Sequence, residues 1–269
     1  SPQLQSSAAS DVYKRQGCSW GDPNFISAEH PDMDTSWKMW PEILAEKLDM
    51  ELINLCKSGQ GQEYIFSTLI DKLQSTPMPS IGLMIPAWST APRRDYQMSG
   101  FQTRKNLWTA DMYDWRGCIE YWIDRSIRYY YSFQSIMELH RIPYKQVQMV
   151  HMYTGYMWHA FRQRERQEYQ IQANNYHIQG ERQPPRSENE DNLDGDDYIW
   201  KQNYKKMCRN QVLTNPYYDR INKNFINWVH PDNTNNDIAP NIERISEKDK
   251  HPSAKGQQQI AEFIYDRLG

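Results

Sequence analysis

The sequence lacks several features that mark well-known classes of protein. No apolar run approaches the roughly 20 residues of a membrane helix, so we expect a soluble protein with no membrane partner. The N-terminal residues contain no apolar signal-peptide core. The formal net charge is -3, and basic residues are mixed with acidic ones instead of forming a stripe, so we expect no nucleic-acid partner.

Cysteine and aliphatic residues are also scarce. The 269 residues include 4 cysteines and no CxxC pair, which favours free thiols in a reducing compartment. Hydrophobic residues make up only 38%, but 10 Trp and 18 Tyr indicate a core rich in aromatic rings. The length suits one sizeable domain.

The first residues have an unusual composition. Asp11–Gln16, DVYKRQ, back-translates to the mosaic-end adapter used in preparing sequencing libraries. We therefore predict that residues 1–16 are an adapter scar, the alternative being a disordered native tail. The serine turn that follows normally comes after a buried strand, and the residues before Gly17 are not apolar. This interpretation implies that the native first strand is missing.

Helix-like and strand-like segments alternate along much of the remaining chain. Apolar residues recur at helical spacing in three segments, residues 34–50, 62–73 and 115–140. Three shorter apolar runs have the length of buried strands, residues 51–56, 80–88 and 141–153. Thr35 or Ser36 can cap the first helix, and Ser253 can cap a final one. The alternation predicts an α/β fold with a parallel sheet, so residues 17–269 are expected to form one domain.

The alternation stops between about residues 155 and 247, where the sequence is polar and rich in charge. We interpret this segment as an insertion, part loop and part short helix, packed over or beside the sheet. The sequence allows two interpretations of this insertion: a catalytic lid, or a solvated and poorly ordered excursion of the chain away from the domain. The low apolar content favours the excursion.

Four short motifs fall at the ends of strands or the starts of helices. GCSWG presents Ser19 in a sharp turn, and NLCKSGQG places Gly59 in a strand-to-helix turn. PAWSTAPRR ends the next strand, and DKHPSAKG carries Asp249 and His251 before the last helix. An aspartate can fix a histidine tautomer, and the histidine can then accept a serine proton. Each motif alone also fits an ordinary turn or surface loop. The histidines at 30, 230 and 251 match no metal-ligand spacing.

The order of these motifs resembles the SGNH (GDSL-like) hydrolase family, especially its branch in tailed-phage and other viral genomes. The resemblance covers residues 17–153 and 249–268. It implies a three-layer α/β/α sandwich with a mostly parallel, flavodoxin-like sheet, here without its native first strand. It also implies a serine esterase that acts on a small-molecule or carbohydrate ester, often an O-acetyl group, with no metal or organic cofactor.

The same resemblance assigns the catalytic residues. Ser19 corresponds to the nucleophile, His251 to the general base, and Asp249 to the residue that orients His251. The last motif reads D-x-H where D-x-x-H is usual in the family, so Asp249 is expected to reach His251 less well. Glu247 is the alternative orienting residue.

The resemblance also assigns an oxyanion hole. The N–H groups of Ser19 and Gly59 carry over to matching positions. The asparagine of the third family motif is absent, and Ser89 or Thr90 offers a hydroxyl in its place. Loss of one such donor typically costs on the order of 3 kcal/mol of transition-state stabilisation.

Three further residues are candidates for substrate binding. Trp20 and Trp88 lie at two of the turns and are predicted to stack on a sugar ring. Arg93 is a candidate for an anionic substrate, with a solvated loop as the alternative. The rival function is a catalytically silent structural or glycan-binding protein of a virus. The missing asparagine and the short last motif favour this rival, and the retained Ser, Gly, Asp and His set opposes it.

Overall fold

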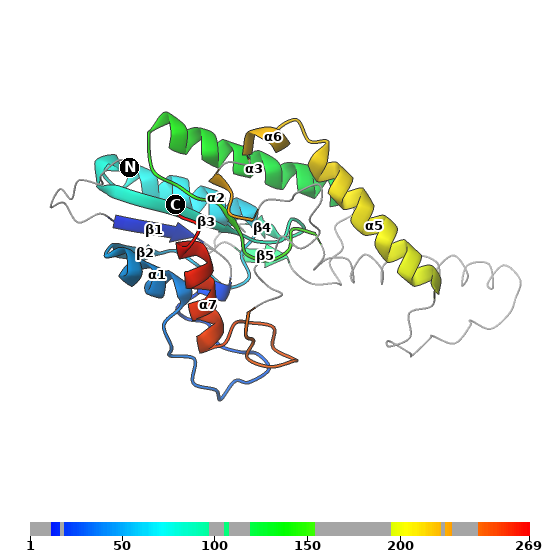
Figure 1. Ribbon diagram of the computed structural model, residues 1–269, viewed down its shortest axis with the longest axis horizontal. Coiled ribbons are helices and arrows are strands. Elements are labelled where there is room, and N and C mark those ends of the chain that lie inside the picture. The colour runs from blue at the N-terminus through cyan, green and yellow to red at the C-terminus, as the bar shows by residue number, and fades with distance from the viewer. Residues whose placement is uncertain are drawn as a thin grey trace, which may run out of the picture.

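The protein has a mixed α/β fold in which helices pack on a short parallel sheet (Figure 1). The computed structural model describes residues 12–16, 19–96, 105–107, 119–153, 195–221, 224–227 and 242–269. The strands are β1 (Val12–Gln16), β2 (Glu51–Asn54), β3 (Ile81–Trp88), β4 (Arg94–Tyr96), β5 (Lys105–Leu107) and β6 (Val147–Gln148). The α-helices are α1 (Trp40–Leu48), α2 (Gln62–Gln74), α3 (Ile119–Leu139), α5 (Gly195–Leu213), α6 (Tyr218–Ile221) and α7 (Ala254–Tyr265). Short 3-10 turns form at Ser19–Gly21 and Met78–Ser80.

The main sheet has the strand order β2-β1-β3-β6, and its strands pair in parallel. β1 lies between β2 and β3, with Tyr13 opposite Leu52 on one side and Leu83 on the other. Val12–Gln16 thus occupies the position of the first strand, and the expected loss of the native strand stays a prediction. The origin of residues 1–16 stays a prediction from the sequence. β4 and β5 form a separate antiparallel pair.

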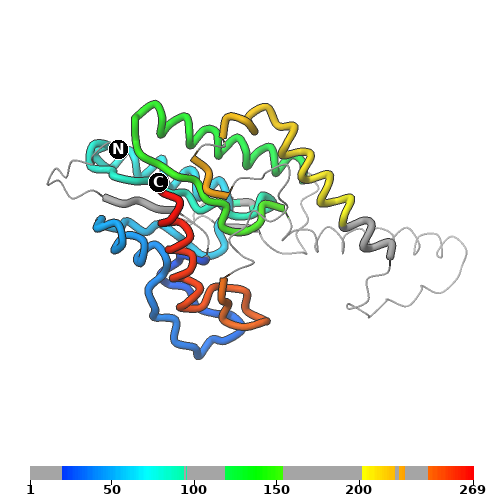
Figure 2. Tube along the Cα trace, viewed as in Figure 1, coloured from blue at the N-terminus to red at the C-terminus, as the bar shows by residue number. Residues whose placement is uncertain are grey.

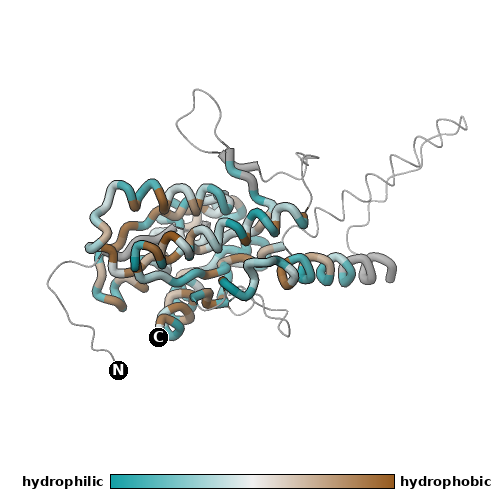
Figure 3. The backbone as a smooth tube through the Cα atoms, turned by 90° about the horizontal axis from the view of Figure 1, so that it is seen from above, coloured by the Kyte–Doolittle hydropathy of each residue, from teal (hydrophilic) through white to brown (hydrophobic). Residues whose placement is uncertain are grey.

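Side chains of β3 alternate between two core clusters, as the period of two in a strand requires. Met84 and Trp88 lie in a cluster with residues of α2 and α3. Ile85 and Ala87 lie in a second cluster with residues of α1 and α7. Figure 3 shows the apolar stretches, drawn in brown, concentrated where strands and helices pack together. Burial of β3 on both sides explains its nearly continuous apolar sequence.

The first helix begins later than its apolar spacing predicts. α1 starts at Trp40, with Met39 as its N-cap. The Glu42 carboxylate accepts a hydrogen bond from the Met39 N–H at 2.7 Å and so closes the first turn. Thr35, one of the expected caps, instead donates its hydroxyl to the Phe25 carbonyl at 2.8 Å. The preceding residues thus belong to a loop.

The last helix begins as predicted. The Ser253 hydroxyl accepts a hydrogen bond from the Gly256 N–H at 3.2 Å, which confirms Ser253 as the cap of α7. Gly256 packs directly against the Glu243 carbonyl, so a side chain at this position would clash. The start of α7 is therefore tied to the loop that precedes it.

The described part of the polar segment is more regular than predicted. α5 is a helix of 19 residues, longer than the short helix we expected. Its Tyr204, Cys208 and Val212 are buried in the cluster that contains α3. Phe225 is also buried and forms a parallel bridge with Gln146 at the edge of the sheet. Residues 154–194, 222–223 and 228–241 lie outside the described residues, and the lid alternative stays a prediction.

Two of the cysteines fall within the described residues. Cys56 and Cys208 are buried, and neither forms a disulfide, in agreement with the prediction. Burial raises the pKa of the Cys208 thiol to about 12. Among the described helices, none is both long enough and apolar enough to cross a membrane.

Candidate active site

The four motifs lie near one edge of the parallel sheet. β1, β2 and β3 run in the same direction, so the turns that follow them leave the sheet at their carboxyl ends. Figure 2 shows the loop before α7, in orange, beside the loop that follows Ser19, in blue. Hydrogen bonds between the motifs define how these turns fit together.

The first and second turns are joined by Asp22. Its Oδ1 accepts the Asn24 N–H at 2.9 Å, and its Oδ2 accepts the Ser58 N–H at 2.6 Å. The Asn54 side-chain amide donates to the Gly21 carbonyl at 2.8 Å. Asp22 is 6% exposed, so its carboxylate depends on the N–H groups of Asn24 and Ser58 for hydrogen bonds. Sequence reasoning missed Asp22, although Asp-Pro-Asn is a typical turn sequence.

The second and third turns are joined by Asp95. Its two carboxylate oxygens accept the N–H groups of Gly61 at 2.7 Å and Tyr64 at 2.8 Å, at the start of α2. Arg93 donates from Nη1 to the Gln60 carbonyl at 3.2 Å. Arg93 therefore holds the second turn in place, which is a structural role in addition to the predicted contact with an anionic substrate.

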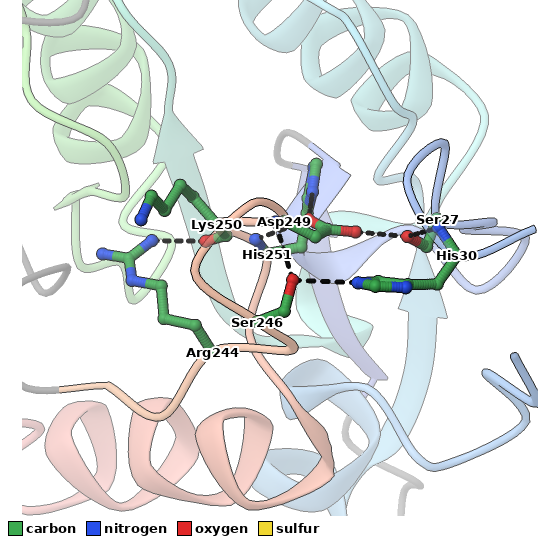
Figure 4. Close-up of polar contacts among 7 residues, drawn as sticks. All are labelled: Ser27, His30, Arg244, Ser246, Asp249, Lys250 and His251. Carbon is green, nitrogen blue, oxygen red and sulfur yellow. Dashed lines mark hydrogen bonds and ion pairs between the residues drawn. The ribbon is translucent and has the colours of Figure 1, made fainter. Parts of the chain in front are cut away.

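The predicted acid–base pair is formed. His251 Nδ1 lies 2.6 Å from Asp249 Oδ1, and the His251 N–H donates to the same oxygen at 2.9 Å (Figure 4). The Asp249 side chain is 3% exposed, whereas the His251 side chain is 34% exposed. The D-x-H spacing thus allows direct contact, contrary to the expected weaker reach, because the backbone N–H turns the carboxylate toward the ring. Glu247 is exposed.

A group of residues that sequence reasoning missed surrounds this pair. The Ser27 hydroxyl donates to Asp249 Oδ2 at 2.5 Å and accepts the His30 N–H at 2.9 Å. The Ser246 hydroxyl accepts the Asp249 N–H at 2.9 Å and lies 2.9 Å from His30 Nε2. No local sequence pattern relates residues 27 and 249, so only the fold reveals this contact.

The ionisation of Asp249 follows from these contacts. Burial raises the pKa of its carboxyl group, but hydrogen bonds from Ser27 and from the His251 N–H and ring lower it, and the net pKa is below its usual value of 3.8. Asp249 is therefore an anion at neutral pH. A carboxylate in this position holds the proton on His251 Nδ1 and leaves Nε2 as the basic nitrogen.

The Trp residues predicted to stack on a sugar are buried. Trp88 is 0% exposed, and its indole N–H donates to Gln146 Oε1 at 2.9 Å within the core. Trp20 is 7% exposed, with the Arg244 guanidinium 5.3 Å from the centre of its ring. Arg244 also donates to the Lys250 carbonyl, next to His251. The interpretation of Trp20 and Trp88 as walls of a sugar site is therefore wrong, because neither presents an open ring face.

The predicted oxyanion residues differ in their surroundings. Gly59 has a φ of +79°, and no atom lies within 4 Å of the position of a side chain there. The Thr90 hydroxyl donates to the Met152 carbonyl at 2.9 Å and is thus already in use. Ser89 is 0% exposed, and its hydroxyl has no hydrogen-bond partner among the described residues. Thr90 is therefore corrected to a structural role, and Ser89 lies in the interior.

Ser19 begins the 3-10 turn that follows β1, so its backbone stands at the carboxyl edge of the sheet. Its side chain lies outside the described part of the chain, and the contact of Ser19 with His251 stays a prediction. In the part of the chain that the structure describes, no group of three or more His, Cys, Asp or Glu residues is placed to hold a metal ion.

No protein-family model matches the sequence, and no curated protein matches it either.

Proposed function

We propose that the protein is a serine hydrolase that cleaves carboxylic esters through an acyl-enzyme. The observation that carries the proposal is the Asp249–His251 pair, with 2.6 Å between the carboxylate and Nδ1. A buried carboxylate beside a partly exposed imidazole is the arrangement that a general base needs. The Ser19 turn at the carboxyl end of β1 supplies the candidate nucleophile.

In the proposed mechanism, His251 Nε2 accepts the proton of the Ser19 hydroxyl as its oxygen attacks the ester carbonyl. Asp249 stabilises the imidazolium that forms. The N–H groups of Ser19 and Gly59 donate to the oxyanion. His251 then protonates the leaving alcohol. Water attacks the acyl-enzyme while His251 accepts its proton, and the acid is released as His251 returns that proton to Ser19.

The family resemblance supplies the finer parts of the proposal. We propose a three-layer α/β/α arrangement of the SGNH type, which the two core clusters that share β3 support. The proposed substrate is a small-molecule or carbohydrate ester, with O-acetyl groups as the first class to test. This substrate class rests on analogy with the family.

A fluorophosphonate probe tests the proposal, because it reacts with activated serines. Folded protein is incubated with the probe, and mass spectrometry maps the modified residue. We expect modification of Ser19 in the wild type and none in Ser19→Ala or His251→Gln. Ser36→Ala, at an exposed serine, is the matched control and should be modified at Ser19 like the wild type.

One observation favours the silent alternative. The hydroxyls that were expected to replace the missing asparagine are either bonded to a carbonyl, at Thr90, or buried, at Ser89. The site therefore has two backbone donors for the oxyanion, and a lost donor typically lowers the rate about 10²–10³-fold. Folded wild-type protein that takes up no probe even after long incubation would support a structural role and exclude the hydrolase.

A further inference from the structure

We propose that Ser27 is a positioning residue that fixes the second carboxylate oxygen of Asp249, so that the first oxygen stays directed at His251. This inference rests on the proposed function, because it names a further residue of the same site. Ser27 is 0% exposed and precedes Asp249 by 222 residues, yet its hydroxyl lies 2.5 Å from Asp249 Oδ2.

The direction of this hydrogen bond is determined by its neighbours. The Ser27 oxygen accepts the His30 N–H at 2.9 Å, and an ionised carboxylate has no hydrogen to donate. The Ser27 hydroxyl hydrogen therefore points to Asp249. A rotation of this hydroxyl away from Asp249 leaves a buried carboxylate oxygen without its donor, which is unfavourable.

Four hydrogen bonds form a closed circuit around the carboxylate (Figure 4). Ser27 bonds to Asp249 Oδ2, the Asp249 N–H bonds to Ser246, Ser246 contacts His30 Nε2, and the His30 N–H returns to Ser27. The circuit connects the loop after the Ser19 turn to the loop before α7. The Asp249 carboxylate cannot rotate without breaking it, so the circuit restrains the orientation of His251.

The chain next to Ser27 packs on the same pair. The Phe25 ring lies 4.4 Å from the His251 ring, measured between centroids, whereas Ile26 is 71% exposed. Phe25 and Ser27 thus contact the site, and the residue between them faces solvent. The Thr35 hydroxyl holds this segment through the Phe25 carbonyl.

Removal of the Ser27 hydroxyl has a defined electrostatic consequence. The Ser27 hydroxyl lowers the pKa of the Asp249 carboxyl group by donating to its charged form, so removal of this donor raises that pKa. The other ionisable groups around the pair are His30, which contacts Ser246, and Arg244 and Lys250, which bond to each other through the Lys250 carbonyl. The Ser27 variants replace none of these groups, although Ser27→Ala also removes the acceptor of the His30 N–H.

The experiment is an NMR titration of the Asp249 carboxyl group in 13C-labelled protein, with Asp249→Asn to assign its signal. We expect Ser27→Ala to raise the pKa of Asp249, because the carboxylate loses the hydroxyl that stabilises its charge. Ser27→Thr keeps the hydroxyl and should titrate like the wild type. Ser27→Cys keeps the volume with a weaker donor, so it should give an intermediate shift even if Ser27→Ala folds poorly.

Thr35→Val is the matched control, because it loosens the same segment without removing the donor to Asp249. An unchanged pKa in folded Ser27→Ala or Ser27→Cys overturns the proposal, and so does an equal shift in Thr35→Val. Fluorophosphonate labelling of Ser19 should also slow about tenfold or more in Ser27→Ala. A pKa shift without labelling of any variant, including the wild type, supports the positioning role and overturns only the proposed function.

Discussion

At the scale of single residues, the Asp249 carboxylate accepts from three donors although its side chain is almost fully buried. One oxygen accepts both the backbone N–H and the ring of His251, and the other accepts the Ser27 hydroxyl. All three contacts stabilise the charged form, and together they outweigh the effect of burial on its pKa. A carboxyl group whose pKa is lowered by folding also stabilises the folded state.

The stability of the protein is therefore expected to depend on this group in acid. The contribution of Asp249 is fully present above its unfolded pKa, near 3.8, and is lost as the pH falls through its lower folded pKa. Asp249→Asn lacks this ionisation, so its free energy of unfolding should fall less steeply with acid than that of the wild type. Urea unfolding between about pH 6 and about pH 2.5 measures the difference.

Asp32→Asn is the control for this prediction, because Asp32 is exposed. Its difference from the wild type should be the same at every pH. Parallel pH profiles for the wild type and Asp249→Asn would contradict the assigned ionisation of Asp249.

Local pattern explains which of these residues could be predicted. Asp249 and His251 are two positions apart before a helix, so the sequence could name both residues, although it predicted a weaker contact than the 2.6 Å that the structure shows. Ser27 could not be predicted, because its bond to Asp249 joins loops that only the fold brings together. Trp88 and Thr90 were misassigned because their position in the sequence does not show the direction of their side chains. Each sits next to a turn in sequence, but its side chain points into the interior.

At the scale of elements, α2 is capped from a distance. Its N-cap is Gly61, which has no side chain to bond the free N–H groups of the first turn. Asp95 of β4 supplies both acceptors instead. A Cβ on Gly61 would lie 2.9 Å from the Arg93 carbonyl oxygen, so the close approach of the two turns requires glycine here.

Loss of this distant cap should destabilise the fold. We expect Asp95→Ala to lower the free energy of unfolding by about 1–2 kcal/mol, because two N–H groups at the helix start lose their acceptor and the favourable charge there is removed. Asp95→Asn keeps one acceptor oxygen and should recover part of the loss. Urea unfolding at neutral pH measures both variants, and a value for Asp95→Ala within error of the wild type would show that the cap contributes nothing.

The elements with strong periodicity were predictable. α2 and β3 lie within one residue of their expected bounds, because apolar spacing and turn residues agree there. α1 starts six residues later than expected, since its cap is formed by a Glu42 side chain and the Met39 backbone. α5 was underestimated because its few buried anchors are separated by polar residues, and only packing on α3 shows their role.

At the scale of the whole molecule, the sheet depends on a strand with an unusual sequence. β1 is flanked by β2 and β3, and it connects directly to the Ser19 turn. Strands in the interior of parallel sheets are usually apolar, because helices cover both sides. Val12–Gln16 instead includes lysine and arginine, which are costly to remove from water without partners. Composition alone argued against a strand here. In the structure, however, residues 12–16 pair with β2 and β3, with Tyr13 opposite Leu52 and Leu83.

This conflict between composition and position can be tested by changing the strand. Replacing Lys14 with Val and Arg15 with Ile gives β1 the apolar, β-branched character of an interior strand. We expect the double variant to raise the free energy of unfolding by about 1 kcal/mol, because β-branched residues are favoured in strands. Lys248→Val, at an exposed position, should have almost no effect on stability.

The same variant also bears on activity, because the Ser19 turn follows β1 directly. If β1 holds that turn, a more stable strand should increase both the unfolding free energy and the rate of fluorophosphonate labelling at Ser19. A gain in stability with no change in labelling would mean that the turn is already fixed by its contacts with the second turn, through Asp22 and Ser58. A loss of stability would contradict the placement of Val12–Gln16 in the interior of the sheet.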